Sequence, residues 1–367
     1  MKKNKILLLG FAFMFILLPV FAQSAPKKVP KGKEEWRYLN QAKEAFEKKD
    51  YGTAFTLAER SKEVRRQDSS YESYVLEYAQ RKIKLRKIGD KLDEVLNELK
   101  VIKQDEAYRI IMRHLDKKGK AFFKNSFAKV LDYIPYYSNY AEADYLIAQI
   151  YRVETEYEIA LSYYKRAFSY CENLDVPAQK YDILYDMASL SFDMQNFDDY
   201  EKYLLMILDD NKYYKDDKFM SAVCNLITDS SGSLSKFFML YRCDDFIGLK
   251  ALIQLNDFYL KQGLTSKAFK TSALAAITAV TKIDHFYSTR DSNYEYNHFA
   301  NLLRNCSKDE DVIKWGNDER IWELFYLFGK TCSENGKILF AKHLFETLKL
   351  DCPDTYWKKM AEKMLLG

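Results

Sequence analysis

Small and apolar residues recur along this chain with the spacing expected of paired helices. The clearest stretch is 322–355. There Gly329 and Ala341 stand where the axes of two antiparallel helices would cross, and Asn335-Gly336 offers a turn between the helices. Pro353 would end the second helix. Large apolar residues occupy the facing stripe: Phe325, Phe328, Phe345 and Leu348. This pattern predicts a helix–turn–helix unit.

The same spacing recurs upstream in units of 34 residues. Each unit has a turn near position 15, and most units have small residues at positions 8 and 20; Asn256 replaces the small residue at position 8 of 249–282. We expect an α-helical pair in each of the units 35–68, 141–174, 181–214, 215–248, 249–282 and 322–355. The three units from 181 to 282 follow one another without a gap. Residues 69–140 and 283–321 are expected to form degenerate pairs, and 356–365 a C-terminal helix. The sequence therefore predicts an all-α protein.

This pattern resembles the tetratricopeptide repeat family over about four fifths of the mature chain. The resemblance implies an α-solenoid, a right-handed superhelix of about seven or eight helix pairs, over 35–367. It also implies a role in binding and not in catalysis. The chain departs from the family because the consensus Trp at position 4 is missing from every unit, and Trp322 stands at position 1. A partner therefore cannot be carried over from well-known members.

The N-terminus is typical of a targeting segment. Lys2, Lys3 and Lys5 precede an uncharged apolar run at 6–21, and small residues favour cleavage after Ala22. We expect a signal peptide at 1–22, a flexible linker at 23–34, and a periplasmic or secreted bacterial protein with no stable membrane insertion. An uncleaved membrane anchor is the alternative, since the apolar run comes close to spanning a bilayer.

Charge and cysteine content restrict the partners. The formal net charge of +4 falls to +1 when the signal peptide is removed, which argues against a nucleic-acid partner. The six cysteines are widely and irregularly spaced, without a CxxC pair. Export permits disulfides, and buried free thiols fit the spacing equally well. No metal site and no cofactor are expected, because no pair of His or Cys has ligand spacing on a helix.

Motifs of catalysis are missing from the sequence. It contains no GxSxG, no phosphate-binding glycine loop and no GxGxxG. We therefore expect a protein that is not an enzyme.

A groove is implied by the resemblance alone. In tetratricopeptide repeat proteins the first helix of each pair lines the concave surface, at positions 2, 5, 9, 12 and 13. Carried onto this chain, that surface comprises Leu39, Lys43, Phe46, Tyr145, Gln149, Arg152, Tyr185, Ser189, Phe192, Ile253, Tyr326 and Lys330. These residues suit a peptide or another apolar segment, and the aromatic ones would equally serve to fill space between units.

Two functions follow as hypotheses. The first is a non-catalytic exported scaffold that binds a protein or peptide segment, similar to bacterial envelope-assembly or transport-accessory proteins. The second is a carrier of a small apolar ligand, with a Tyr- and Phe-lined pocket closed by 283–321. Position 9 lacks the Asn of family members that clamp carboxylates, so this kind of clamping is not expected.

Overall fold

Every regular element in the described part of the chain is a helix. The computed structural model describes residues 35–83, 138–229, 231–240 and 247–366. The prediction of an all-α protein is therefore confirmed. The predicted signal peptide, the linker and residues 84–137 of the degenerate segment lie outside the described residues.

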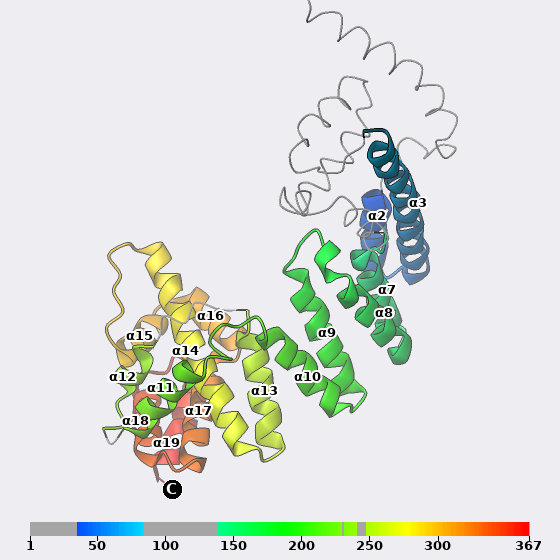
Figure 1. The fold of residues 1–367 in the computed structure, drawn as a ribbon. Helices are drawn as coiled ribbons and strands as arrows, with labels where there is room; N and C mark the ends of the chain where they lie inside the picture. Colours follow the sequence, from blue (N-terminus) through cyan, green and yellow to red (C-terminus); the bar gives the residue numbers. More distant parts are fainter. Residues whose placement is uncertain (1–34, 84–137, 230, 241–246, 367) are drawn as a thin grey trace, which may run out of the picture. The chain divides into compact units, whose positions relative to one another are not determined.

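The chain divides into two compact units, Met1–Ile183 and Leu184–Gly367. The first unit contains α2 (Glu35–Glu47), α3 (Tyr51–Ile83), α7 (Ala141–Val153), α8 (Tyr157–Ser169), a 3-10 turn at Cys171–Asn173 and the start of α9 (Gln179–Asp193). Helices α2 and α3 pack along each other through fully buried alanines, Ala42, Ala54 and Ala58, whose small side chains let the axes approach. Helix α3 also packs against α7, and α7 packs against α8 (Figure 1).

The second unit holds most of α9 and ten further helices among its described residues. They are α10 (Phe197–Leu208), α11 (Asp217–Thr228), α12 (Leu234–Phe238), α13 (Leu249–Lys261), α14 (Thr265–Arg290), α15 (Phe299–Cys306), α16 (Glu310–Asp318), α17 (Ile321–Glu334), α18 (Ile338–Asp351) and α19 (Thr355–Leu366) (Figure 1). None of the described helices combines the length and apolar character needed to cross a membrane.

Five helix pairs share one turn geometry. In each, the residue at position 15 of the unit has a left-handed backbone and lies two residues before the second helix: Lys49, Thr155, Gln195, Gly263 and Gly336. In the last pair the N–H of Gly336 donates to the carbonyl of Ser333 at 3.0 Å, and the N–H of Lys337 donates to that of Cys332 at 2.8 Å. The same two bonds recur in the other four turns. This is a Schellman cap, which satisfies carbonyls that the helix end leaves open.

The order of packing in the second unit differs from the order of the sequence. Helix α13 packs against α10, α14 against α17, and α18 against α19. Helices α11 and α12, which form the predicted 215–248 unit, lie between α10 and α13 in sequence, yet α12 contacts α15 and α18. The unbroken 34-residue register of 181–282 therefore does not correspond to three consecutive pairs in space.

Two phenylalanines explain the position of α12. Phe237 and Phe238 are completely buried, although α12 has only five residues. The ring of Phe238 stacks on Phe299 of α15 with centroids 4.1 Å apart, and Phe237 lies 5.2 Å from Phe340 of α18. Burial of two rings stabilises a short segment that could not hold a helix alone. We call these two side chains the aromatic plug.

The crossing of α17 and α18 requires a glycine. A Cβ on Gly329 would lie 2.8 Å from two ring atoms of Phe345. The four large residues predicted for the facing stripe, Phe325, Phe328, Phe345 and Leu348, are all buried. The predicted degenerate segment 283–321 begins inside α14, which continues to Arg290 because its middle, 271–280, is buried on every side. Helices α15 and α16 make up the rest of that segment.

Candidate functional site

Two rows of side chains from α9 and α13 face each other in the second unit. Tyr185, Ser189 and Phe192 recur at a spacing that places them on one face of α9. The row on α13 has the same kind of spacing and consists of Lys250, Gln254, Asp257 and Lys261. The Tyr185 hydroxyl donates to the carbonyl of Ile247 at 3.3 Å and accepts the N–H of Ala251 at 3.1 Å. These bonds hold the α9 row against the N-terminal end of α13.

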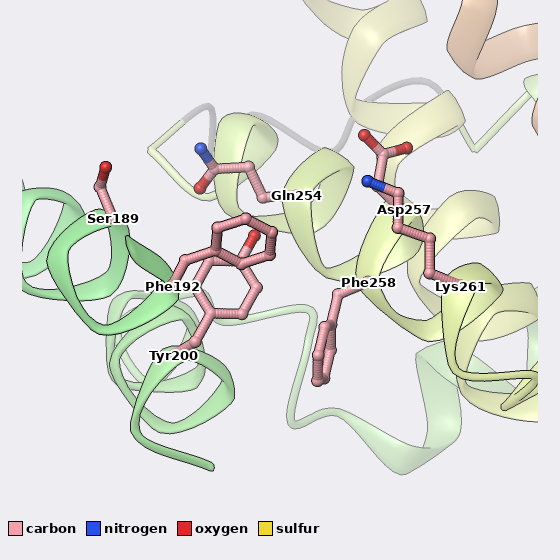
Figure 2. Close-up of a pocket in the computed structure, with 7 residues that line it drawn as sticks. All are labelled: Ser189, Phe192, Tyr200, Gln254, Asp257, Phe258 and Lys261. Carbon is pink, nitrogen blue, oxygen red and sulfur yellow. The ribbon is translucent and has the colours of Figure 1, made fainter. Parts of the chain in front are cut away.

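A hollow of about 170 Å³ lies farther along the two rows. Figure 2 shows its lining: Ser189 and Phe192 of α9, Tyr200 of α10, and Gln254, Asp257, Phe258 and Lys261 of α13. The ring of Tyr200 lies 5.2 Å from that of Phe192 and 5.3 Å from that of Phe258. Phe192 keeps 43% of its surface exposed, so an aromatic face is open to a partner.

Two charged side chains line the hollow, and only one of them has an ion-pair partner among the described residues. Asp257 forms an ion pair of 2.6 Å with Arg320, which also bonds Glu323 at 2.7 Å. Hydrogen bonds to Glu323 and Asp257 raise the pKa of Arg320, so the guanidinium stays charged and is shared by the two carboxylates. Lys261 is exposed, and no carboxylate of the described residues lies within ion-pair distance of it. The hollow therefore presents one cation beside an aromatic wall.

Tyr200 contributes a neutral hydroxyl. Burial, together with the charge of Asp257, raises the pKa of Tyr200 to about 12. The phenol therefore stays protonated at neutral pH and offers both a donor and an acceptor. With a cation, an ion-paired carboxylate and a neutral phenol, the hollow is equipped for recognition and holds no activated nucleophile.

The predicted groove residues of the first unit have mixed surroundings. Leu39 is buried in the core between α2, α3 and α7, and Phe46 packs on Tyr51 with centroids 5.6 Å apart. The ring centroids of Tyr145 and Tyr164 lie 5.9 Å apart. The remaining predicted residues of this unit reach solvent: Lys43 is exposed, and Gln149 and Arg152 are half-buried.

The predicted residues of the second unit divide into two groups. Ser189 and Phe192 line the hollow, and Tyr185 of the same row bonds the N-terminal end of α13. Ile253 is buried in the packing of α13. Tyr326 is buried between Phe345 and Trp357, so it fills space between α17, α18 and α19, and Lys330 pairs with Glu334 at 3.8 Å. Of the predicted residues, Ser189 and Phe192 of the α9 row are the two that line the hollow.

Sequence reasoning did not single out Tyr200, Gln254, Phe258 and Lys261 as groove residues. One signal was available, because Tyr200 stands at position 20, where close packing of a pair favours a small residue. The ring there turns toward α13 and supplies the floor of the hollow. Lys261 stands at position 13 of its unit, a groove position in the family, so the sequence offered a signal for it as well. Gln254 and Phe258 stand at positions 6 and 10, which the family pattern leaves out.

A second polar cluster lies inside the first unit. The buried carboxylate of Asp144 accepts two bonds from the Arg166 guanidinium, at 2.6 and 2.8 Å, and pairs with Lys62 at 3.0 Å. Lys62 also bonds Glu59 at 2.6 Å, and Arg166 lies over the ring of Tyr163. Since each charge has its counterpart, the cluster ties α3, α7 and α8 together and offers no open position to a ligand.

Nothing among the described residues indicates a metal site or a reactive thiol. No group of three or more His, Cys, Asp or Glu side chains there could hold a metal ion. The five cysteines that lie in these ranges are free thiols. Burial raises the pKa of Cys306 and of Cys352 to about 12, so these thiols are not nucleophiles at neutral pH. The sixth, Cys243, lies outside the described residues.

Fold and site together define an all-α protein with an aromatic hollow between helix pairs. Protein-family models were compared with the chain, and none matches it. Among curated proteins, the chain is similar to a protein of Treponema pallidum (strain Nichols) described as an uncharacterized protein, with 27% identity over 341 residues. The alignment covers 92% of this chain and 91% of that protein. The similarity therefore extends over nearly the whole of both chains and assigns no activity.

Proposed function

We propose that this protein is an exported, non-catalytic scaffold whose helix pairs form a tetratricopeptide-like solenoid and bind a protein or peptide segment. The observation that carries the binding proposal is the hollow between α9 and α13, where the exposed ring of Phe192 stands beside an unpaired cation, Lys261. An exposed aromatic side chain in a concave site is typical of an anchor point for a partner.

Two features support the tetratricopeptide-like architecture. Five pairs share one turn at the same position of the 34-residue unit. In both compact halves of the chain, the second helix of one pair packs on the first helix of a later pair. Examples are α3 with α7, α10 with α13, and α14 with α17. A stack of helix pairs is built from such contacts.

The size of the hollow favours a peptide over a small ligand. Pockets that enclose a small organic ligand usually measure about 300–1,000 Å³. The hollow measures about 170 Å³, and no residue of 283–321 lines it. In place of closing a pocket, α15 of that segment packs on α12 and α18. A side chain of a longer partner fits this space better than a whole ligand does.

Site-specific photocrosslinking tests the binding proposal. Phe192 would be replaced by benzoyl-phenylalanine in the native organism, and crosslinked proteins would be identified by mass spectrometry. The matched control is the same replacement at Leu350, an exposed apolar residue of α18 in the same unit. We expect a discrete adduct from position 192, and we expect Ser189→Trp, which fills the hollow, to abolish it. An adduct pattern equal to that of position 350, or one unaffected by Ser189→Trp, contradicts binding in the hollow.

Export is tested separately. The basic and apolar pattern of residues 1–22 motivates the proposal of a cleaved signal. We expect the periplasmic or secreted fraction to contain a protein whose N-terminal residue is Gln23, as determined by N-terminal sequencing. Full-length protein confined to the cytoplasm, or retained in the membrane with Met1 at its N-terminus, contradicts it.

A further inference from the structure

We infer that the hollow selects an extended peptide carrying one aromatic or large aliphatic side chain next to an acidic residue. This inference rests on the proposed function and specifies its partner.

The volume corresponds to one side chain. An apolar cavity of about 150 Å³ holds a benzene-sized group. The hollow, at about 170 Å³, offers that space between Phe192, Tyr200 and Phe258. In Figure 2 the rings of Phe192 and Tyr200 stand on one side and the ring of Phe258 on the other. Because Tyr200 contacts both phenylalanines, the three rings form one aromatic surface, against which an inserted ring would pack.

The charge at the rim calls for an acidic neighbour. Asp257 forms an ion pair with Arg320 at 2.6 Å, and no ion pair joins it to Lys261 among the described residues. Lys261 stands at the last residue of α13 and is exposed, which leaves its ammonium available to a carboxylate of the partner. The other cation of the α13 row, Lys250, lies 4.9 Å from the ring centroid of Tyr185. The α13 row, with Lys250, Asp257 and Lys261, therefore carries a net charge of +1, and Lys261 is its exposed cation at the hollow.

We propose an extended partner because of the length of the α13 row. Lys250 and Lys261 are eleven positions apart on α13, which corresponds to about 16 Å along the helix axis. An extended segment covers this distance with about five residues. A free fatty acid shares the apolar and anionic character, but its chain exceeds what the hollow can enclose. We therefore assign the site to a peptide.

The test uses the full mature protein and four fluorescein-labelled peptides with a Gly-Ser host sequence. The central pairs are Phe-Asp, Phe-Lys, Ala-Asp and Ala-Lys, and binding is measured by fluorescence polarisation. We expect Phe-Asp to bind tightest and Ala-Asp to bind about tenfold more weakly, because burial of the ring supplies most of the affinity. Phe-Lys should bind about threefold more weakly than Phe-Asp.

A charge swap makes the test specific. Lys261→Glu should reverse the order so that Phe-Lys binds better than Phe-Asp, whereas Lys270→Glu, the same change at an exposed position of α14, should leave the order unchanged. Phe192→Ala should weaken both Phe peptides about equally. If the order of Phe-Asp and Phe-Lys does not depend on Lys261, the inference is wrong.

The peptide-binding test and the photocrosslinking test can fail independently of each other. Adducts at position 192 together with no binding of any of the four peptides would overturn the peptide specificity and leave the scaffold proposal standing. Absence of both would overturn both. Saturable binding of laurate that responds to Ser189→Trp, with no peptide bound, would overturn the assignment to a peptide and favour a small-ligand carrier.

Discussion

Adding a single methyl group at the crossing of α17 and α18 tests the packing argument most directly. Gly329 is buried, and in Gly329→Ala the new Cβ would lie 2.8 Å from Cε1 and Cζ of Phe345 and 3.3 Å from Cδ1. Real Cβ atoms essentially never approach ring carbons as closely as 2.8 Å, so either the ring or the helix must move. Phe345 is 3% exposed, and its ring lies 5.8 Å from that of Tyr326, so the ring has little room to retreat.

Two opposing contributions to the free energy of unfolding decide whether Gly329→Ala stabilises or destabilises the protein. Alanine is favoured over glycine inside a helix by about 1 kcal/mol. Overpacking of a well-filled core costs about 1–3 kcal/mol. Because the clash involves two ring atoms of a buried side chain, we expect the second effect to win. The net loss should be about 1–2 kcal/mol, which lowers the melting temperature of the second unit by roughly 2–8 °C.

A matched control separates propensity from packing. A Cβ on Gly52, an exposed glycine near the start of α3, would meet no atom within 4 Å. Gly52→Ala should therefore stabilise the first unit, by a few tenths to about 1 kcal/mol. Differential scanning calorimetry and urea unfolding followed by circular dichroism at 222 nm would compare both variants with the wild type. A Gly329→Ala protein as stable as the wild type, or more stable, would refute the close packing of α17 on α18.

Further predictions concern buried charge, pH and thiols. Asp144→Ala should destabilise the first unit by roughly 3 kcal/mol in urea unfolding, because Lys62 stays buried without this carboxylate; a loss below 1 kcal/mol would contradict the network. Hydrogen bonds from Lys236 and Ser231 lower the pKa of Asp229 to about 2, below its ordinary 3.8. The stability that these bonds contribute is therefore complete above pH 4 and lost as the pH falls toward 2, and an NMR titration midpoint near 4 would disprove this. Iodoacetamide at pH 8 should label Cys306, whose pKa burial raises to about 12, only after denaturation, as read by mass spectrometry.

The sequence could predict the helices because their signals are local. Gly336 and the small residues Gly329 and Ala341 mark one pair completely, and the structure has a turn and a crossing there. Three of the five turns carry no glycine at the left-handed position, where Lys49, Thr155 and Gln195 stand. Spacing, and not turn chemistry, was the usable signal at those positions.

The site could be predicted only in part, because it depends on contacts that are distant in sequence. Tyr185, Ser189 and Phe192 follow from their spacing on one helix. Their neighbours on α13 do not, since a regular 34-residue register suggests that α11 and α12 come next in space. The ion pair of Asp257 with Arg320 joins residues that are 63 positions apart, and nothing in the local sequence indicates it.

The aromatic plug has a consequence for how the second unit can change over evolutionary time. In an array whose members touch only their neighbours, a terminal member can be lost or copied at modest cost. Here Phe237 and Phe238 belong to an early segment of the unit, yet their rings are covered by α15, α17 and α18. Deleting the last pair, α17 and α18, would expose both rings to water. Duplicating this pair would produce a copy without Phe237 and Phe238 to pack against it. The C-terminal half of this protein therefore depends on contacts between segments distant in sequence, as a single compact domain does.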